Sequence, residues 1–339
     1  MIARTLFASA IAILVAFGTM GGVLAWQASP ATGPSACAPA TDEELERIAR
    51  EWSQDVLAGG DWSALEALVS PDLIHHGATL NDTRHVADFE TGLQRILDAF
   101  PDLTHRVEFV VTASPYVADR WIASGTHTGP FHDVAPTGRR VTWEGINLLR
   151  VECGKVVDSW AAVDQIGRMQ QIAGTATATT PVAATATAAA IACAPTTREQ
   201  AETAVRAWFA RIWDAGDADA LHAITTDDLV HHWAIGPDSI GNDALLHRSA
   251  AWRAAMPDMA TTVDVLAVGD GFAAARWTME GTQTGAYMGA APTGEATTWT
   301  GINLFRFCDG KIAEVWSEMD TANILDRFGL TDVAATPTP

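Results

Sequence analysis

Two aspartates stand at the end of a repeated stretch of sequence, and their type and position suit acid/base chemistry. Asp164 follows Asn147 at the same spacing at which Asp320 follows Asn303, and the copies lie 156 positions apart (303 − 147 = 156 and 320 − 164 = 156). A carboxylate that enters an apolar pocket loses hydration, so its pKa rises towards the pH at which a base removes a proton beside a carbonyl. Each aspartate also precedes a short predicted helix, where Asp is favoured as an N-cap, and the two roles are compatible.

Each copy also contains an adjacent pair of histidines, His75-His76 and His231-His232. Adjacent residues of an extended chain point to opposite faces, so at most one histidine of each pair can enter a pocket. There it would hydrogen-bond a ligand oxygen, and the alternative is a structural histidine. Neighbouring histidines rarely chelate one ion together and no carboxylate triad accompanies them, so the sequence predicts no metal site.

Further polar and aromatic residues fall on the predicted strands that lead to the aspartates. His127 could polarise a carbonyl or share a proton with Asp164, whereas the second copy has Gln283, which cannot titrate. Asn147 and Asn303 could orient a ligand carbonyl or hydrogen-bond between strands. Tryptophans are expected to form pocket wall and core together, and those expected to face the ligand are Trp121, Trp143, Trp160, Trp277, Trp299 and Trp316.

Other chemistries and partners find no support in the sequence. No Gly-x-Ser-x-Gly motif occurs, and no glycine-rich phosphate loop precedes a helix. The 41 acidic against 21 basic residues give a formal net charge of −20, which repels nucleic acid and anionic membrane surfaces. We therefore expect a small molecule, and not a nucleic acid, as the partner.

In each copy helices precede the strands. Capping patterns at Thr41 to Glu44 and Thr196 to Glu199 mark the first helices. Alternating apolar residues then predict strands at 106–113, 120–128, 139–151 and 155–163, and at 262–268, 273–284, 296–307 and 311–319. Helices followed by antiparallel strands predict an α+β fold in two copies, each a cone-shaped curved antiparallel sheet wrapped over the N-terminal helices with a pocket at its open end.

Strand parity groups the residues on each face of this sheet. Trp160 and Asp164 share a face of the last strand, and His127 and Asn147 share faces with tryptophans of the two strands before it. If the tryptophan face is the concave one, then His127, Asn147 and Asp164 look into the same cavity.

The length and composition of the chain predict two domains. A chain of 339 residues is long for one core, given the prior of about 150 residues per domain. We expect domain 1 at 38–173, a Thr/Ala-rich linker at 174–193, domain 2 at 194–330 and a disordered tail at 331–339.

The N-terminus has the features of a targeting segment. Arg4 is followed by an almost wholly apolar run that ends on small residues at Ala25, as in a cleaved signal peptide at 1–25. An uncleaved membrane anchor is the alternative, because the run approaches the ~20 residues that span a bilayer. Either way, we expect an extracytoplasmic protein, secreted or membrane-anchored.

Export makes the four cysteines interpretable as disulfides. Four cysteines allow three pairings, and the repeat favours Cys37–Cys153 and Cys193–Cys308. Each bond would join the segment before the first helix to the turn of a late hairpin. Metal binding is disfavoured because no Cys-x-x-Cys occurs and the expected compartment is oxidising.

Four motifs recur in the same order in the two copies. The first copy has Gly-Thr-His-Thr-Gly at 125–129, Pro-Thr-Gly at 136–138, Gly-Ile-Asn at 145–147 and Trp-x-x-x-Asp at 160–164. The second has Gly-Thr-Gln-Thr-Gly at 281–285, Pro-Thr-Gly at 292–294, Gly-Ile-Asn at 301–303 and Trp-x-x-x-Asp at 316–320. Together these motifs resemble the SnoaL-like polyketide cyclases of the nuclear transport factor 2-like superfamily, and the resemblance covers both copies nearly end to end.

The resemblance implies a cone-shaped α+β barrel with an apolar pocket, and a reaction that needs no metal or organic cofactor. The cyclases of this family close a ring by an intramolecular aldol step, using an acidic residue that corresponds to Asp164 and Asp320 here. Their pocket histidine corresponds to His127. The resemblance also favours His76 and His232 within the two histidine pairs.

These observations lead to two hypotheses. The first is an exported tandem SnoaL-like protein that binds small apolar carbonyl compounds and catalyses cyclisation, isomerisation or hydrolysis in at least domain 1. Asp164 would be the base, with His127 and His76 holding the enolate oxygen. The alternative is a non-catalytic exported binding protein of the same fold. Domains of this fold often pair through the convex sheet, so pairing within the chain or a homodimer is expected.

Overall fold

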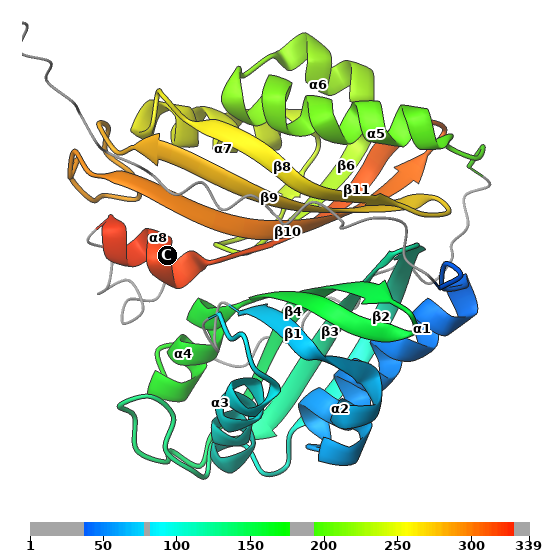
Figure 1. The fold of residues 1–339 in the computed structure, drawn as a ribbon. Helices are drawn as coiled ribbons and strands as arrows, with labels where there is room; N and C mark the ends of the chain where they lie inside the picture. Colours follow the sequence, from blue (N-terminus) through cyan, green and yellow to red (C-terminus); the bar gives the residue numbers. More distant parts are fainter. Residues whose placement is uncertain (1–36, 78–81, 177–192, 329–339) are drawn as a thin grey trace, which may run out of the picture. The chain divides into compact units, whose positions relative to one another are not determined.

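Two α+β domains with the same order of elements make up the computed structural model, which describes residues 37–77, 82–176 and 193–328 (Figure 1). Domain 1 denotes the described residues up to 176, and domain 2 those from 193 onwards. The expected signal peptide at 1–25, the expected tail at 331–339 and most of the expected linker lie outside the described residues. Within the described ranges, none of the helices is both long and apolar enough to cross a membrane.

Three helices of domain 1, which begin at Asp42, Trp62 and Gln165, have a side-chain cap at the residue before. Thr41 Oγ1 accepts the amide of Glu44 at 3.2 Å, and Asp61 Oδ1 accepts the amide of Ala64 at 3.0 Å. Such caps pair amides that have no partner inside the helix. The helices are α1 (Asp42–Glu51), the π-helical turn η1 (Trp52–Ala58), α2 (Trp62–Leu68), α3 (Val86–Ala99) and α4 (Gln165–Ala173).

Five strands form the sheet of domain 1 in the order β1-β5-β4-β3-β2. The last four are antiparallel, as the sequence predicts: β2 (Thr104–Ala113), β3 (Tyr116–Thr126), β4 (Arg140–Glu152) and β5 (Lys155–Val163). The first strand, β1 (Val69–Gly77), pairs parallel to β5, so the sheet is mixed and not purely antiparallel. This polar segment shows no strong alternation, and its pairing depends on an edge of β5 that only the folded chain provides.

Domain 2 repeats this plan with one added edge strand, in the order β7-β6-β11-β10-β9-β8. Its capping box uses Thr197 and Gln200, one position later than the sequence predicts. The helices are α5 (Arg198–Ala207), η2 (Trp208–Asp214), α6 (Ala218–Ile224), α7 (Asn242–Ala255) and α8 (Thr321–Arg327). The strands are β6 (Thr225–Trp233), β7 (Ser239–Ile240), β8 (Ala260–Val268), β9 (Phe272–Thr282), β10 (Ala296–Cys308) and β11 (Lys311–Met319).

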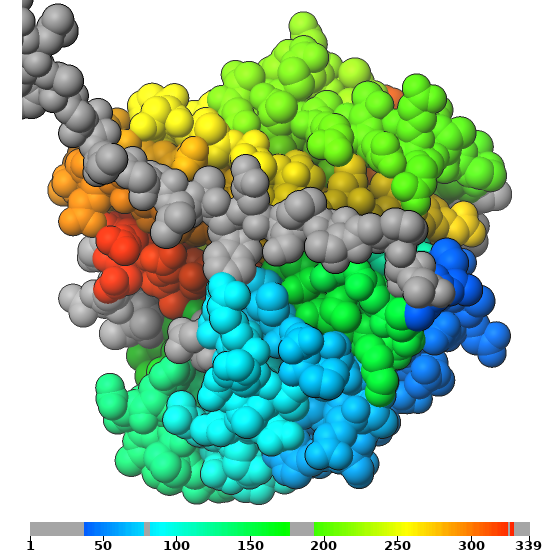
Figure 2. Space-filling view, in the orientation of Figure 1, coloured from blue at the N-terminus to red at the C-terminus, as the bar shows by residue number. Residues whose placement is uncertain are grey.

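In each domain the helices before the sheet pack on one of its faces, called the inner face below. Figure 1 shows α5, α6 and α7 on that face of domain 2, and in the space-filling view α5 and α6 form its light-green outer surface (Figure 2). In domain 1 Leu149 and Val151 of β4 join Trp52 of η1 in one buried cluster. Ile146 and Leu148, which alternate with the inner-face residues, lie on the outer face. Both faces of the sheet are therefore apolar.

Both predicted disulfides are confirmed. Cys37 is bonded to Cys153 and Cys193 to Cys308, with Cα atoms 5.2 and 4.9 Å apart. Each bond ties the segment before the first helix to the turn of the last hairpin. The bonds indicate an oxidising, extracytoplasmic environment, where disulfides persist.

Candidate functional site

A cavity lies between the inner face of the domain 1 sheet and the helices that cover it. Together with the space at its opening to solvent, it spans about 550 Å³. Helical residues such as Trp52 and Leu93, and strand residues such as Trp121 and Trp143, make most of its wall apolar. Four polar side chains from four different elements also line it: His75 of β1, His105 of β2, Asn147 of β4 and Arg168 of α4.

The two cavity histidines are neutral at pH 7. Burial lowers the pKa of both His75 and His105 to about 3, because desolvation disfavours the charged imidazole. His75 Nδ1 lies 2.8 Å from Ser159 Oγ, and His105 stacks on Trp121 with ring centroids 4.4 Å apart. Among the described residues, His75 Nε2 and His105 Nδ1 have no hydrogen-bond partner. These two nitrogens can therefore bond a ligand.

Arg168 places a buried cation in the cavity wall. Arg168 is only 2% exposed. Its guanidinium carbon lies 4.8 Å from the centroid of the Phe131 ring and 5.5 Å from the centroid of the Trp143 ring. Aromatic faces attract a desolvated cation. Burial lowers the pKa of Arg168 to about 10, and nearby Asp164 opposes the shift, so the guanidinium stays protonated at neutral pH.

Asp164 ends β5 beside this cation. Its Oδ1 accepts the amide of Gly167 at 2.7 Å, which makes it the N-cap of α4. Burial raises the pKa of Asp164 to about 6; the Gly167 hydrogen bond opposes the rise, and Glu144 adds to it. The cavity wall contains its neighbours Val163 and Arg168 but not Asp164 itself. A carboxyl with this pKa is mostly ionised at pH 7 and is a stronger base than an ordinary aspartate.

A buried polar network lies behind Asn147. Asp119, which is 0% exposed, accepts hydrogen bonds from Ser53 Oγ at 2.7 Å and from Asn147 Nδ2 at 3.3 Å. Asn147 Nδ2 also donates to Ser53 Oγ at 3.2 Å. Burial raises the pKa of Asp119 to about 7, although the two hydrogen bonds to it oppose the rise.

The structure places His75 at the cavity and His76 outside it. Ala161 and Val163 line the cavity, so Trp160 and Ala162, which alternate with them along β5, point to the outer face, where the Trp160 ring stacks on His76 with centroids 5.3 Å apart. The expectation that Trp160 and His76 face a ligand is therefore corrected. Its premise was that all tryptophans share the concave face, but the outer face is apolar as well and accommodates Trp160.

In domain 2 the equivalent outer-face pair is Trp316 and His232, stacked at 5.5 Å, which corrects the expectation for these residues in the same way. His232 Nδ1 lies 2.8 Å from Asp238 Oδ2 and its Nε2 lies 2.9 Å from Glu314 Oε1. Burial alone would lower the pKa of His232, but the hydrogen bonds to both carboxylates raise it to about 9. Glu314 also accepts Arg306 Nε at 2.8 Å. This protonated imidazole belongs to a structural ion cluster.

His127 and Gln283 occupy a shared structural position, and neither belongs to a cavity wall. His127 Nδ1 lies 3.0 Å from Thr137 Oγ1, and Gln283 Oε1 accepts Thr293 Oγ1 at 2.9 Å. In both copies this contact closes the loop that ends in Pro-Thr-Gly. A glutamine can replace the histidine because the contact requires only an acceptor. Burial lowers the pKa of His127, which keeps it neutral.

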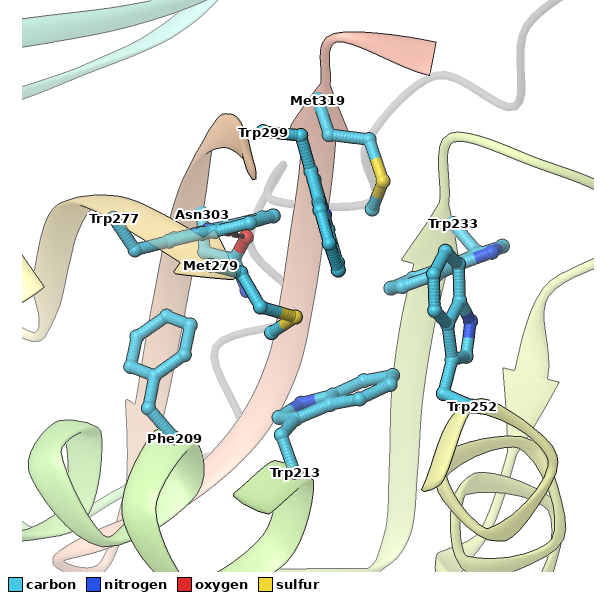
Figure 3. Close-up of a pocket in the computed structure, with 9 residues that line it drawn as sticks. All are labelled: Phe209, Trp213, Trp233, Trp252, Trp277, Met279, Trp299, Asn303 and Met319. Atoms are coloured by element: carbon cyan, nitrogen blue, oxygen red, sulfur yellow. Dashed lines mark hydrogen bonds between the residues drawn. The ribbon is translucent and has the colours of Figure 1, made fainter. Parts of the chain in front are cut away.

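Domain 2 has a smaller cavity, of about 300 Å³, and it is almost wholly aromatic (Figure 3). Its wall consists of Phe209, Trp213, Trp233, Trp252, Trp277, Met279, Trp299, Asn303 and Met319. Three of these tryptophans stand 156 positions after Leu57, Gly77 and Ile96 of the larger cavity, so larger side chains fill the space. None of the described residues in this wall titrates. Asp320 caps α8 through the amide of Asn323, and burial raises its pKa.

Sequence reasoning missed His105, Arg168 and Asp119. Comparing the two copies could have pointed to these three residues, because the positions 156 residues later hold residues that do not ionise, Thr261, Ile324 and Ala275. Polar residues that only one copy keeps in otherwise matching segments mark chemistry specific to that copy. Within the described ranges, no three His, Cys, Asp or Glu side chains gather closely enough to hold a metal ion.

Comparisons with known proteins agree with this fold. The profile of the SnoaL-like polyketide cyclase family matches residues 47–172 and 203–327. The chain therefore belongs to the SnoaL-like polyketide cyclase family and contains two copies of its domain. This family's fold binds small molecules and supports a cyclase-type function.

Several solved structures each resemble one copy. AclR, a proposed hydroxylase of Streptomyces galilaeus, is 29% identical over 39% of this chain and 94% of its own, with a TM-score of 0.34. IdmH, a proposed polyketide cyclase of Streptomyces antibioticus, is 28% identical over 38% and 98%, with a TM-score of 0.35. A proposed SnoaL-like cyclase of Jannaschia sp. CCS1 is 18% identical over 41% and 94%, with a TM-score of 0.37. No curated protein matches the chain.

Proposed function

We propose that this protein binds small apolar carbonyl compounds and that domain 1 catalyses acid/base chemistry on them without a cofactor. The reaction class is intramolecular cyclisation or a related isomerisation or hydrolysis. One observation carries the proposal: an apolar cavity has a buried cation, Arg168, in its wall, and beside this cation, next to the wall residue Val163, lies a carboxyl, Asp164, whose pKa is raised to about 6. A base and an oxyanion-stabilising group are thus adjacent.

For cyclisation, Asp164 removes a proton from the carbon next to a substrate carbonyl. The resulting enolate oxygen is stabilised by Arg168 and by hydrogen bonds from the neutral imidazoles of His75 and His105. The enolate carbon attacks a second carbonyl of the same molecule, and the new alkoxide takes the proton back from Asp164. His75 and His105 replace His76 and His127 in this role because they line the cavity.

For domain 2 we propose a binding role, which corresponds to the non-catalytic alternative. Its wall offers a single amide, Asn303, among aromatic and methionine side chains, which suits an apolar ligand. Asp320 remains a candidate base, although no cavity cation accompanies it, since Ile324 stands where domain 1 has Arg168.

We also propose that the protein is exported, by cleavage of residues 1–25 or with that segment as an anchor. The two disulfides and the apolar run after Arg4 support export. The outer faces of the sheets carry apolar residues, among them Leu148 and Trp160 in domain 1 and Leu304 and Trp316 in domain 2. Large apolar faces are rarely left in water, which supports pairing of the domains or a homodimer.

The test is a screen of the purified protein against aryl 1,3-diketones, polyketide-type esters and small lactones, with mass spectrometry of the products. Asp164→Asn should lower turnover at least about 100-fold while ligand binding persists, since that is the usual contribution of general-base catalysis. Asp320→Asn is the matched control and should leave domain 1 turnover unchanged. Full activity of the Asp164→Asn variant would refute the assignment of the base.

A further inference from the structure

The equivalent asparagines of the two cavities are held in opposite orientations. In domain 2, Trp277 Nε1 donates to Asn303 Oδ1 at 2.8 Å, as Figure 3 shows. In domain 1, Asn147 donates from its Nδ2 group to Ser53 Oγ and to Asp119 Oδ2. An indole N–H can only donate, so it faces the amide oxygen of Asn303. The ionised carboxylate of Asp119, which prevails above its pKa of about 7, can only accept, so it faces the amide nitrogen of Asn147.

The cause is two substitutions behind the amide. Asn147 lies opposite Asp119 in the β3–β4 pairing, and Asn303 lies opposite Ala275 in the β9–β10 pairing. Ser53 is replaced 156 positions later by Phe209. Without these acceptors, Asn303 has no local partner for Nδ2 and turns its oxygen to the indole.

The orientation in domain 1 leaves two polar atoms for a ligand. Because the Asn147 amide nitrogen donates within the wall, its Oδ1 is the atom left at the cavity. Trp121, the counterpart of Trp277, is 3% exposed and lines the cavity, and its Nε1 has no hydrogen-bond partner among the described residues. A buried indole N–H without a partner loses a hydrogen bond that a ligand oxygen could restore.

We propose that Asp119 is a positioning residue that holds Asn147 with Oδ1 towards the cavity, so that domain 1 selects ligands carrying a hydroxyl or enol donor beside an acceptor oxygen. Enolised 1,3-diketones and β-hydroxy carbonyl compounds have this pair, and simple ketones do not. This inference rests on the proposed binding of carbonyl compounds and specifies their class. Domain 2, with its amide oxygen engaged, lacks the selectivity.

Two probes with the same apolar body test the selectivity. 3-Hydroxy-1-phenylbutan-1-one offers a hydroxyl donor beside a carbonyl acceptor, whereas butyrophenone offers only the acceptor. Titration calorimetry with the full chain should show about tenfold tighter binding of the hydroxy ketone, the value of one hydrogen bond. The double variant Ser53→Ala/Asp119→Leu, which removes both acceptors of the Asn147 amide nitrogen, should abolish this preference. Asp119→Asn can still accept from Ser53 and Asn147, so it should retain the preference.

An NMR measurement tests the orientation without a ligand. The indole N–H signal of Trp121, assigned through Trp121→Phe, should shift in Ser53→Ala/Asp119→Leu as Asn147 turns to accept it. The Trp277 signal is the internal control and should not move. If Ser53→Ala/Asp119→Leu keeps both the probe preference and the Trp121 signal, the positioning role is refuted. If the wild type binds neither probe but the Trp121 signal shifts as expected, the positioning stands and the proposed ligand class fails.

Discussion

The ion cluster around His232 predicts a specific dependence of stability on pH. His232 lies between Asp238 and Glu314, at 2.8 and 2.9 Å, and its side chain is 14% exposed. The folded-state pKa of about 9 exceeds the ordinary value of about 6.5. A group whose pKa is raised by folding stabilises the fold fully below its unfolded pKa, and the contribution is lost as pH rises through the folded pKa.

The rise of the His232 pKa from its ordinary value to about 9 corresponds to about 3 kcal/mol of stability. His232→Gln should therefore be less stable than the wild type at pH 6, and the difference should close between pH 6.5 and 9. For a domain of this size about 3 kcal/mol corresponds to a shift of roughly 9 °C in Tm. The measurement is calorimetric unfolding of both proteins from pH 6 to pH 9.5, with disulfides intact.

The matched control is His76→Gln. His76 occupies the equivalent position in domain 1 but lies 3.4 Å from Asp82, and Asp158 replaces Glu314. Its variant should show a smaller difference over the same pH range. The reasoning is refuted if the Tm difference between wild type and His232→Gln is the same at pH 6 and pH 9.5, or if NMR titration of His232 gives a pKa near 6.5.

Three further predictions follow from the buried groups. Arg168→Ile, which introduces the residue found in domain 2, should lower kcat about 100-fold or more with a small change in KM. The reason is that the Arg168 cation stabilises charge that develops in the transition state. Steady-state kinetics with a substrate that the protein turns over measures both constants, and an unchanged kcat would contradict the prediction. Asp119→Asn should be more stable than the wild type at pH 8, by up to about 4 kcal/mol. Burial raises the pKa of Asp119 to about 7, so its ionised carboxylate destabilises the fold above pH 7, whereas below about pH 4 the carboxyl is protonated in both states and the cost disappears. Equal unfolding free energies of the two proteins at pH 8 would contradict this prediction. Replacing Cys37 and Cys153 by alanine should lower the unfolding free energy of domain 1 by about 5 kcal/mol, the chain-entropy value for a sequence separation of 116; denaturant unfolding measures it, and a change below about 1 kcal/mol would contradict it.

Much of the fold was predictable because it follows from local patterns and from the repeat. Period-two alternation located the eight antiparallel strands, since one face of each must be buried. The constant offset of 156 positions selected Cys37–Cys153 and Cys193–Cys308 from three possible pairings. Strand β1 was not predicted, because its partner β5 is distant in sequence and its own residues show little alternation.

The candidate site was predictable only in part. The N-cap role of Asp164 follows from its place before α4. In an extended chain, neighbouring side chains point to opposite faces, so the sequence also predicts that one histidine of each pair lies on the inner face. Alternation cannot tell which face of a strand is concave when both faces are apolar, so His76 and Trp160 were placed on the wrong side. His105 and Arg168 carry no motif and reach the cavity through packing alone.

The sequence by itself determined the duplication, the disulfide pairing, the α+β class and the family resemblance, because each follows from residue types and their spacing. Only the tertiary structure decided which side chains meet. Ser53, Asp119 and Asn147 come from three separate elements, and their shared network exists only once η1 packs against β3 and β4. The orientation of one amide, and with it the proposed selectivity of domain 1, depends on that contact because a carboxylate accepts hydrogen bonds and cannot donate them.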